Sequence, residues 1–171
     1  MKKLLTLTFL LLLFTAHSQD SILIKSKVAN AIGELREFVA IPNDALNADD
    51  IDSNLFWLRK KFTERGFNST ILETEGLPLF FAALPMDDNK PTILFYMHLD
   101  GQSVDATKWD QVDPYKVVLK SKTEDDWKTE SFSELNDDIN YDWRLFGRST
   151  SDDKGPIIMF LNAIDALKKD A

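Results

Sequence analysis

The sequence has 171 residues, of which 44% are hydrophobic, and it carries a formal net charge of -8. A chain of this length can bury one core, so we expect one domain or part of one, and its acidity disfavours nucleic acids and anionic membranes as partners. It has no cysteine, which excludes disulfides and thiolate metal sites and leaves histidine and carboxylate side chains as the ligands for any metal.

The first 18 residues have the pattern of a signal peptide. Lys2 and Lys3 precede an apolar stretch that ends at Ala16 and is too short to span a bilayer comfortably. Ala16 and Ser18 are the small residues that a signal peptidase recognises, so we predict cleavage after Ser18 and an exported protein, periplasmic or extracellular, with no membrane attachment afterwards. An uncleaved N-terminal anchor is the alternative. Cleavage would also remove His17 and leave the mature chain with a single histidine.

Two amphipathic helices are predicted next. The first runs from about Ser21 to Ile41 and ends before Pro42, and the second begins at the capping residue Asn47 and ends at Gly66. In each helix the apolar residues recur every three or four positions: Val28, Ile32, Leu35 and Val39 in the first, and Ile51, Leu55, Leu58 and Phe62 in the second.

Strand-like segments follow, from Ser69 to Glu73 and from Leu79 to Leu84. The run from Thr92 to Met97 is continuously apolar or β-branched, which is typical of a strand buried on both faces, and polar residues begin where this strand would end. Two helices followed by strands predict a layered α/β domain. Open sheets of this class have their chemistry at strand ends, which makes His98 and Asp100 candidate functional residues.

The rest of the chain alternates between loops and short elements. Tyr115 to Lys120 predicts a strand, and residues 121–142 are polar and acidic, so we expect a solvated excursion there, with a lid over a substrate as the alternative. Apolar character resumes from Trp143 to Phe146. A last helix is predicted from Pro156, a residue that suits the first helical turn.

Four polar residues in two places could carry chemistry. A lone histidine such as His98 is more often structural than a metal ligand, but Asp100 could accept its second N–H and make the other ring nitrogen a better metal donor. Asp152 and Asp153 lie just before the predicted last helix, where they could cap the helix or bind a metal. A carboxylate can bridge two cations, and histidine with a shared carboxylate is the chemistry of zinc hydrolases.

The sequence Tyr-Met-His98-Leu-Asp100-Gly-Gln-Ser-Val-Asp105, together with Leu-Phe-Gly-Arg-Ser-Thr-Ser-Asp152-Asp153-Lys-Gly-Pro156, resembles the dinuclear-zinc peptidase and aminoacylase family. This family includes glutamate carboxypeptidases, carnosinase-type dipeptidases and succinyl-diaminopimelate desuccinylases. The resemblance implies a zinc-peptidase catalytic domain with a central mixed sheet flanked by helices. It also implies that His98 binds one metal ion, that Asp152 bridges two, that Asp100 is a catalytic residue orienting His98, and that the Asp152–Asp153 peptide bond is cis.

The same resemblance implies an activity. A water molecule activated by two Zn²⁺ ions, or by Co²⁺ or Mn²⁺, would hydrolyse an amide bond in a dipeptide or an N-acyl amino acid, and the family leaves a homodimer open. The general base and the remaining ligands of the family lie further along than this sequence extends. We therefore expect residues 19–171 to be the N-terminal part of the catalytic domain, without its C-terminal part and lid domain, and inactive alone.

Two other interpretations stay open. Ser151 and Lys154 match the Ser-x-x-Lys pattern of serine acyl-transfer enzymes, although four residues with two free positions match often by chance. The chain could also be an exported binding module without catalytic activity, or an inactive relative, whose aspartate-rich loops bind calcium weakly.

Overall fold

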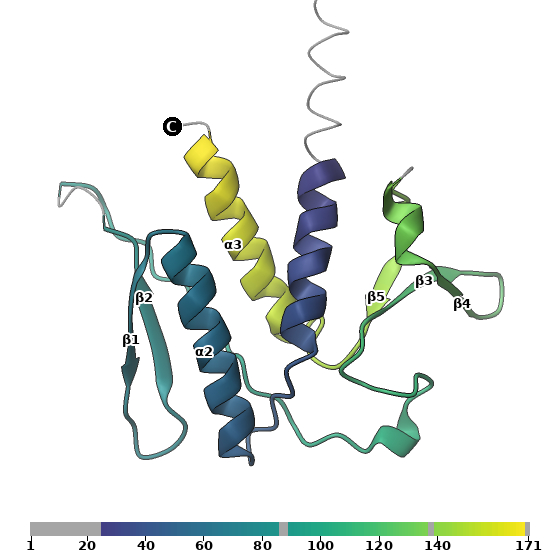
Figure 1. Ribbon diagram of the computed structural model, residues 1–171, viewed down its shortest axis with the longest axis horizontal. Coiled ribbons are helices and arrows are strands. Elements are labelled where there is room, and N and C mark those ends of the chain that lie inside the picture. Colours follow the sequence, from purple (N-terminus) through teal and green to yellow (C-terminus); the bar gives the residue numbers. More distant parts are fainter. Residues whose placement is uncertain (1–24, 86–88, 137–138, 170–171) are drawn as a thin grey trace, which may run out of the picture.

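Three helices carry most of the core in the computed structural model, which describes residues 25–85, 89–136 and 139–169 (Figure 1). They are a first helix of residues 25–39, α2 (Ala48–Glu64) and α3 (Lys154–Lys169). All three contribute to one buried cluster, in which Phe38, Leu58 and Leu161 are among the most buried side chains. The predicted signal peptide, residues 1–18, lies outside the described residues.

The ends of α2 confirm the prediction from sequence. Asn47 caps the helix by accepting a hydrogen bond from the main-chain N–H of Asp49, which satisfies one donor that the first turn leaves free. At the other end Gly66 has a φ of 77°, the left-handed conformation that favours glycine after a helix. Local side-chain and backbone signals therefore determine this helix.

The described strands form two small antiparallel sheets. β1 (Asn68–Leu72) pairs with β2 (Leu79–Ala83), and β3 (Val118–Lys122) lies between β4 (Trp127–Glu130) and β5 (Arg144–Phe146). The predicted α/β class is confirmed. The sheets are separate and antiparallel, however, whereas the resemblance implied one central mixed sheet.

The predicted buried strand from Thr92 to Met97 is wrong for the described part of the chain. This segment has no regular secondary structure, and Ile93 and Tyr96 are 74% and 85% exposed. A strand buried on both faces needs neighbouring strands and covering helices, and no described strand lies beside this one. Just after this segment the chain is fixed to the loop before α2, because Gly101 forms an isolated parallel β-bridge with Asp44.

The predicted solvated excursion at residues 121–142 is only partly confirmed. The segment contains β4 and a 3₁₀ helix, Phe132–Asn136. Leu135 and Ile139 are buried against Leu119 of β3 and form a second, smaller core. The acidic composition concealed these apolar anchors, because two apolar residues among so many polar ones are too few to establish a periodic pattern.

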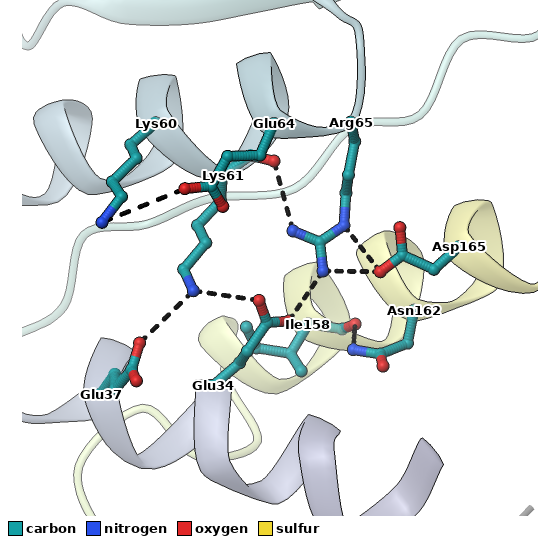
Figure 2. Close-up of polar contacts among 9 residues, drawn as sticks. All are labelled: Glu34, Glu37, Lys60, Lys61, Glu64, Arg65, Ile158, Asn162 and Asp165. Atoms are coloured by element: carbon teal, nitrogen blue, oxygen red, sulfur yellow. Dashed lines mark hydrogen bonds and ion pairs between the residues drawn. The ribbon is translucent and has the colours of Figure 1, made fainter. Parts of the chain in front are cut away.

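A network of charged side chains joins the three helices at the C-terminal end of α3 (Figure 2). Arg65, which follows α2, lies 2.9 Å from Glu34 of the first helix and 2.7 Å from Asp165 of α3. Lys61 also contacts Glu34, at 3.0 Å. A cavity of about 700 Å³ lies beside this network and is lined by Arg65, Glu34 and Asp165 among others.

Candidate metal site

The two motifs that the sequence singled out meet in space. The Nε2 atom of His98 lies 2.9 Å from Oδ1 of Asp152, although the residues are 54 positions apart. His98 lies at the end of the exposed segment, and Asp152 lies in the turn just before α3. The Asp152 side chain is 87% exposed, so its second oxygen faces solvent and is open to a further ligand.

The main chain of Asp100, rather than its carboxylate, approaches the other ring nitrogen. Nδ1 of His98 is 3.2 Å from the carbonyl oxygen of Asp100 and 3.6 Å from its Oδ1 atom, which is beyond hydrogen-bond distance. A proton on Nδ1 can therefore be donated to this carbonyl. That arrangement leaves the lone pair of Nε2 directed toward Asp152.

The surroundings raise the pKa of His98 above its ordinary value. Burial opposes the charged form, but the carbonyl of Asp100, the hydrogen bond to Asp152 and the negative charges of both aspartates outweigh it. The negative charge around the ring therefore favours the protonated form of His98. This is the environment that also favours a bound cation.

Asp153 has a distinct role from its neighbour. Its Oδ2 atom accepts a hydrogen bond of 3.2 Å from the main-chain N–H of His98, so both aspartates of the pair contact the same residue. The peptide bond between Asp152 and Asp153 is cis, as the family resemblance implied. The sequence did not indicate that Asp153 would hold the His98 main chain.

The residues present fit part of a metal site. An imidazole nitrogen and a carboxylate oxygen are ordinary Zn²⁺ ligands, and two ligands of a tetrahedral zinc lie about 3.4 Å apart. The observed 2.9 Å is a hydrogen-bond distance, so the two side chains would have to separate slightly to hold one ion. Within residues 25–85, 89–136 and 139–169, no group of three or more candidate ligands is close enough to hold an ion. Among the described residues, His98 and Asp152 are therefore two candidate ligands without a third nearby.

Lys154 donates hydrogen bonds to the main chain at the end of the first helix and just after it. Its fully buried side chain donates from Nζ to the carbonyl oxygens of Phe38, at 2.7 Å, and Ile41, at 2.6 Å, and burial lowers its pKa to about 7. Ser151 is exposed. The Ser-x-x-Lys interpretation loses its support, because the amine that would activate the serine is occupied elsewhere.

Known proteins resemble the chain over limited regions. No protein-family model matches it. It is 30% identical over 125 residues to a Cys-Gly metallodipeptidase of Schizosaccharomyces pombe, covering 71% of this chain and 22% of the relative. It is 33% identical over 91 residues to the Beta-Ala-His dipeptidase of Homo sapiens, covering 53% of this chain and 14% of the relative.

Two solved structures that resemble this chain are also dipeptidases. A dipeptidase of Saccharomyces cerevisiae matches with a TM-score of 0.63 and 20% identity, covering 85% of this chain and 30% of that structure. Human carnosine dipeptidase 1 matches with a TM-score of 0.60 and 22% identity, covering 85% of this chain and 31% of that structure. These relatives support a dinuclear-zinc dipeptidase family for the part of the chain that they cover, and the two solved structures share its fold.

The metallodipeptidase comparison also corrects the predicted localisation. The yeast Cys-Gly metallodipeptidases among the relatives are cytosolic, so the prediction of a periplasmic or extracellular protein is wrong. The apolar N-terminal stretch that suggested export lies outside the described residues. Among the described helices, none has the length and apolar character needed to cross a membrane.

Proposed function

We propose that this chain is the N-terminal part of a metal-dependent dipeptidase in which His98 and Asp152 are two of the metal ligands. The main support is the 2.9 Å distance between Nε2 of His98 and Oδ1 of Asp152, because it places the two family-like motifs side by side. The chain spans 14% to 22% of the length of the curated relatives that it matches, so the activity of the whole protein is part of the proposal.

The chain's own residues prepare the two ligands. The Asp100 carbonyl receives the Nδ1 proton of His98 and so fixes the tautomer, while Asp153 holds the main chain of the same residue. Bound Zn²⁺ would supply a Lewis acid and lower the pKa of a water molecule. The exposed second oxygen of Asp152 leaves room for this carboxylate to bridge two ions. Co²⁺ or Mn²⁺ could substitute.

The substrate proposed is a dipeptide, since the relatives are named as Beta-Ala-His and Cys-Gly dipeptidases. An N-acyl amino acid has the same scissile amide bond and is the broader class. Because two ligands do not complete a tetrahedral site, we propose that residues outside the described ones supply the other ligands and the general base. The 171-residue chain alone is then expected not to turn over substrate.

The test uses the full-length protein, with metal content and dipeptide hydrolysis as the two measurements. His98→Ala and Asp152→Asn should each lower metal content and reduce kcat/KM by about a hundredfold or more, because each removes a ligand. Asp105→Asn is the matched control, since this exposed aspartate of the same motif contacts Thr107 and Lys108 instead. Unchanged metal content and rates in His98→Ala would overturn the proposal.

A further inference from the structure

We propose that Asn43 is a positioning residue of the candidate metal site, and that its buried amide sets the spacing between the His98 and Asp152 segments. The inference rests on the proposed function, since it assigns a support to the same site. Asn43 lies in the loop between the first helix and α2, and its side chain is fully buried.

One amide group joins both segments. The Nδ2 atom of Asn43 donates to the carbonyl oxygen of Leu99 at 2.6 Å and to Oγ of Ser149 at 2.9 Å. Leu99 is adjacent to His98, and Ser149 lies three residues before Asp152. The two candidate ligands are therefore connected through a single planar group with two donor directions.

The main chain of Asn43 strengthens its hold on the His98 side. Its carbonyl oxygen accepts a hydrogen bond of 2.7 Å from the N–H of Gly101, and the N–H of Ala45 donates to the Gly101 carbonyl at 2.9 Å. A Cβ atom at Gly101 would lie 3.1 Å from Nδ2 of Asn43 and 2.8 Å from Nη2 of Arg148. A larger residue at position 101 would therefore press on the Asn43 amide and the Arg148 guanidinium group, so the close approach of the two loops favours glycine.

Ser149 extends the connection to the start of α3. It is buried and has a φ of 61°, and its hydroxyl group lies 3.4 Å from Oδ1 of Asn43. Its carbonyl oxygen accepts a hydrogen bond of 3.1 Å from the N–H of Lys154. Asp152 lies between Ser149 and Lys154, so the turn that carries this ligand is held at both ends.

The chemistry of the two acceptors explains why the residue is asparagine. Both Leu99 O and Ser149 Oγ need a hydrogen from position 43, and a primary amide supplies two. An ionised aspartate of the same shape supplies none and would place a carboxylate oxygen against the Leu99 carbonyl. Alanine leaves both acceptors without this partner.

Asn54 provides a matched control within the same chain. It is also fully buried, and its Nδ2 donates to the carbonyl oxygens of Pro42, at 2.6 Å, and Asp50, at 2.7 Å. Asn54→Ala therefore removes an equally buried amide with two comparable hydrogen bonds. Neither bond reaches the segment of His98 or that of Asp152.

The experiment compares Asn43→Ala, Asn54→Ala and His98→Ala in the full-length protein. The first measurement is the dissociation constant for Co²⁺, and the second is the ¹⁵N chemical shifts of the His98 ring in the metal-free protein. We expect Asn43→Ala to weaken Co²⁺ binding by about tenfold or more and to shift the ring nitrogens, whereas Asn54→Ala changes affinity by about twofold at most. Equal effects of the two asparagine variants on both measurements would overturn the inference.

Two further variants keep the outcome decisive. If Asn43→Ala does not fold, Ser149→Ala removes only the hydroxyl group that Asn43 contacts, and it should weaken Co²⁺ binding by about threefold to tenfold; an unchanged affinity would count against the inference. His98→Ala separates this inference from the proposed function. Loss of Co²⁺ binding in His98→Ala with no effect in Asn43→Ala overturns only the positioning role, while full binding in His98→Ala overturns the metal site itself.

Discussion

The two ends of α3 hold buried cations in opposite ways. At the C-terminal end, the Arg65 side chain is 9% exposed and lies 2.9 Å from Glu34 and 2.7 Å from Asp165 (Figure 2). At the N-terminal end, the fully buried Lys154 ammonium group donates to the carbonyl oxygens of Phe38 and Ile41. The first cation has two carboxylate partners, and the second has two neutral ones.

The pKa values of the two cations differ in direction as a result. Burial alone would lower the pKa of Arg65, but its hydrogen bonds and the charges of Asp165 and Glu34 raise it. Burial lowers the pKa of Lys154 to about 7, and the charge of Asp50 opposes this only weakly. Carbonyl dipoles thus compensate less for lost hydration than carboxylates do.

The largest expected effect is the pH dependence of folding stability that Lys154 confers. Its folded pKa of about 7 is below its unfolded value of 10.5, so between these values the unfolded chain binds more protons and stability rises with pH. The free energy of unfolding should rise by about 1.4 kcal/mol per pH unit within this window, and this added stability is lost as the pH falls toward 7. Urea denaturation of the wild-type chain and Lys154→Met from pH 7 to 10 measures it.

Lys154→Met should lack this slope, because methionine fills a similar volume without a titratable group. Parallel curves for the two proteins between pH 7 and 10 would show that Lys154 keeps an ordinary pKa. In that case burial against carbonyl groups would not depress the pKa of the cation at the N-terminal end of α3.

The next effect concerns the backbone at the N-terminal end of α3. A Cβ atom at Gly155 would lie 2.2 Å from the carbonyl oxygen of Thr150, so Gly155→Ala must displace the turn that carries Asp152. We expect a loss of about 3 kcal/mol in the free energy of unfolding. Gly33→Ala, in the first helix, is the control, because a Cβ there meets nothing within 4 Å. It should stabilise the chain by about 0.5 to 1 kcal/mol.

A smaller effect is expected at the C-terminal end of α3. Arg65→Met removes the partner of two carboxylates, but the Glu34 and Asp165 side chains are 19% and 40% exposed and remain hydrated in part. The expected loss is about 1 to 2 kcal/mol, reduced in high salt. Lys60→Met is the control, since the pair of Lys60 with Glu64 is solvent-exposed and 4.0 Å long, and should cost about 0.5 kcal/mol or less. Equal losses in both variants would contradict a buried network.

Sequence patterns predicted the parts of the fold that depend on near neighbours. The start of α2 is an example, because the cap that Asn47 provides involves a residue two positions away. His98 and Asp152 were predicted from their chemistry and from the family resemblance, and the structure brings them together. Their role as ligands stays a prediction.

The residues that hold the candidate site were not predicted, because their contacts are with residues far away in the sequence. Asn43 contacts residues 56 and 106 positions away, and the acceptors of Lys154 are 116 and 113 positions away. Asparagine after a proline and lysine at a helix start are ordinary surface choices, so no local pattern distinguishes the buried cases. For the segment from Thr92 to Met97 the error was the reverse: its apolar composition predicts a buried strand, but the described residues leave it exposed.

The smallest expected effect tests that exposed segment. In the 171-residue chain, Ile93→Ser and Tyr96→Ser should each change the free energy of unfolding by about 0.5 kcal/mol or less, because both side chains are largely exposed. Leu161→Ala, at a fully buried position of α3, should cost about 2 to 5 kcal/mol in the same urea titration. A loss of that larger size in Ile93→Ser would mean that the segment is buried in solution, as its apolar pattern predicts. The same substitutions should also be measured in the full-length protein, because a loss of stability that appears only there would identify the segment as a strand covered by the rest of the protein.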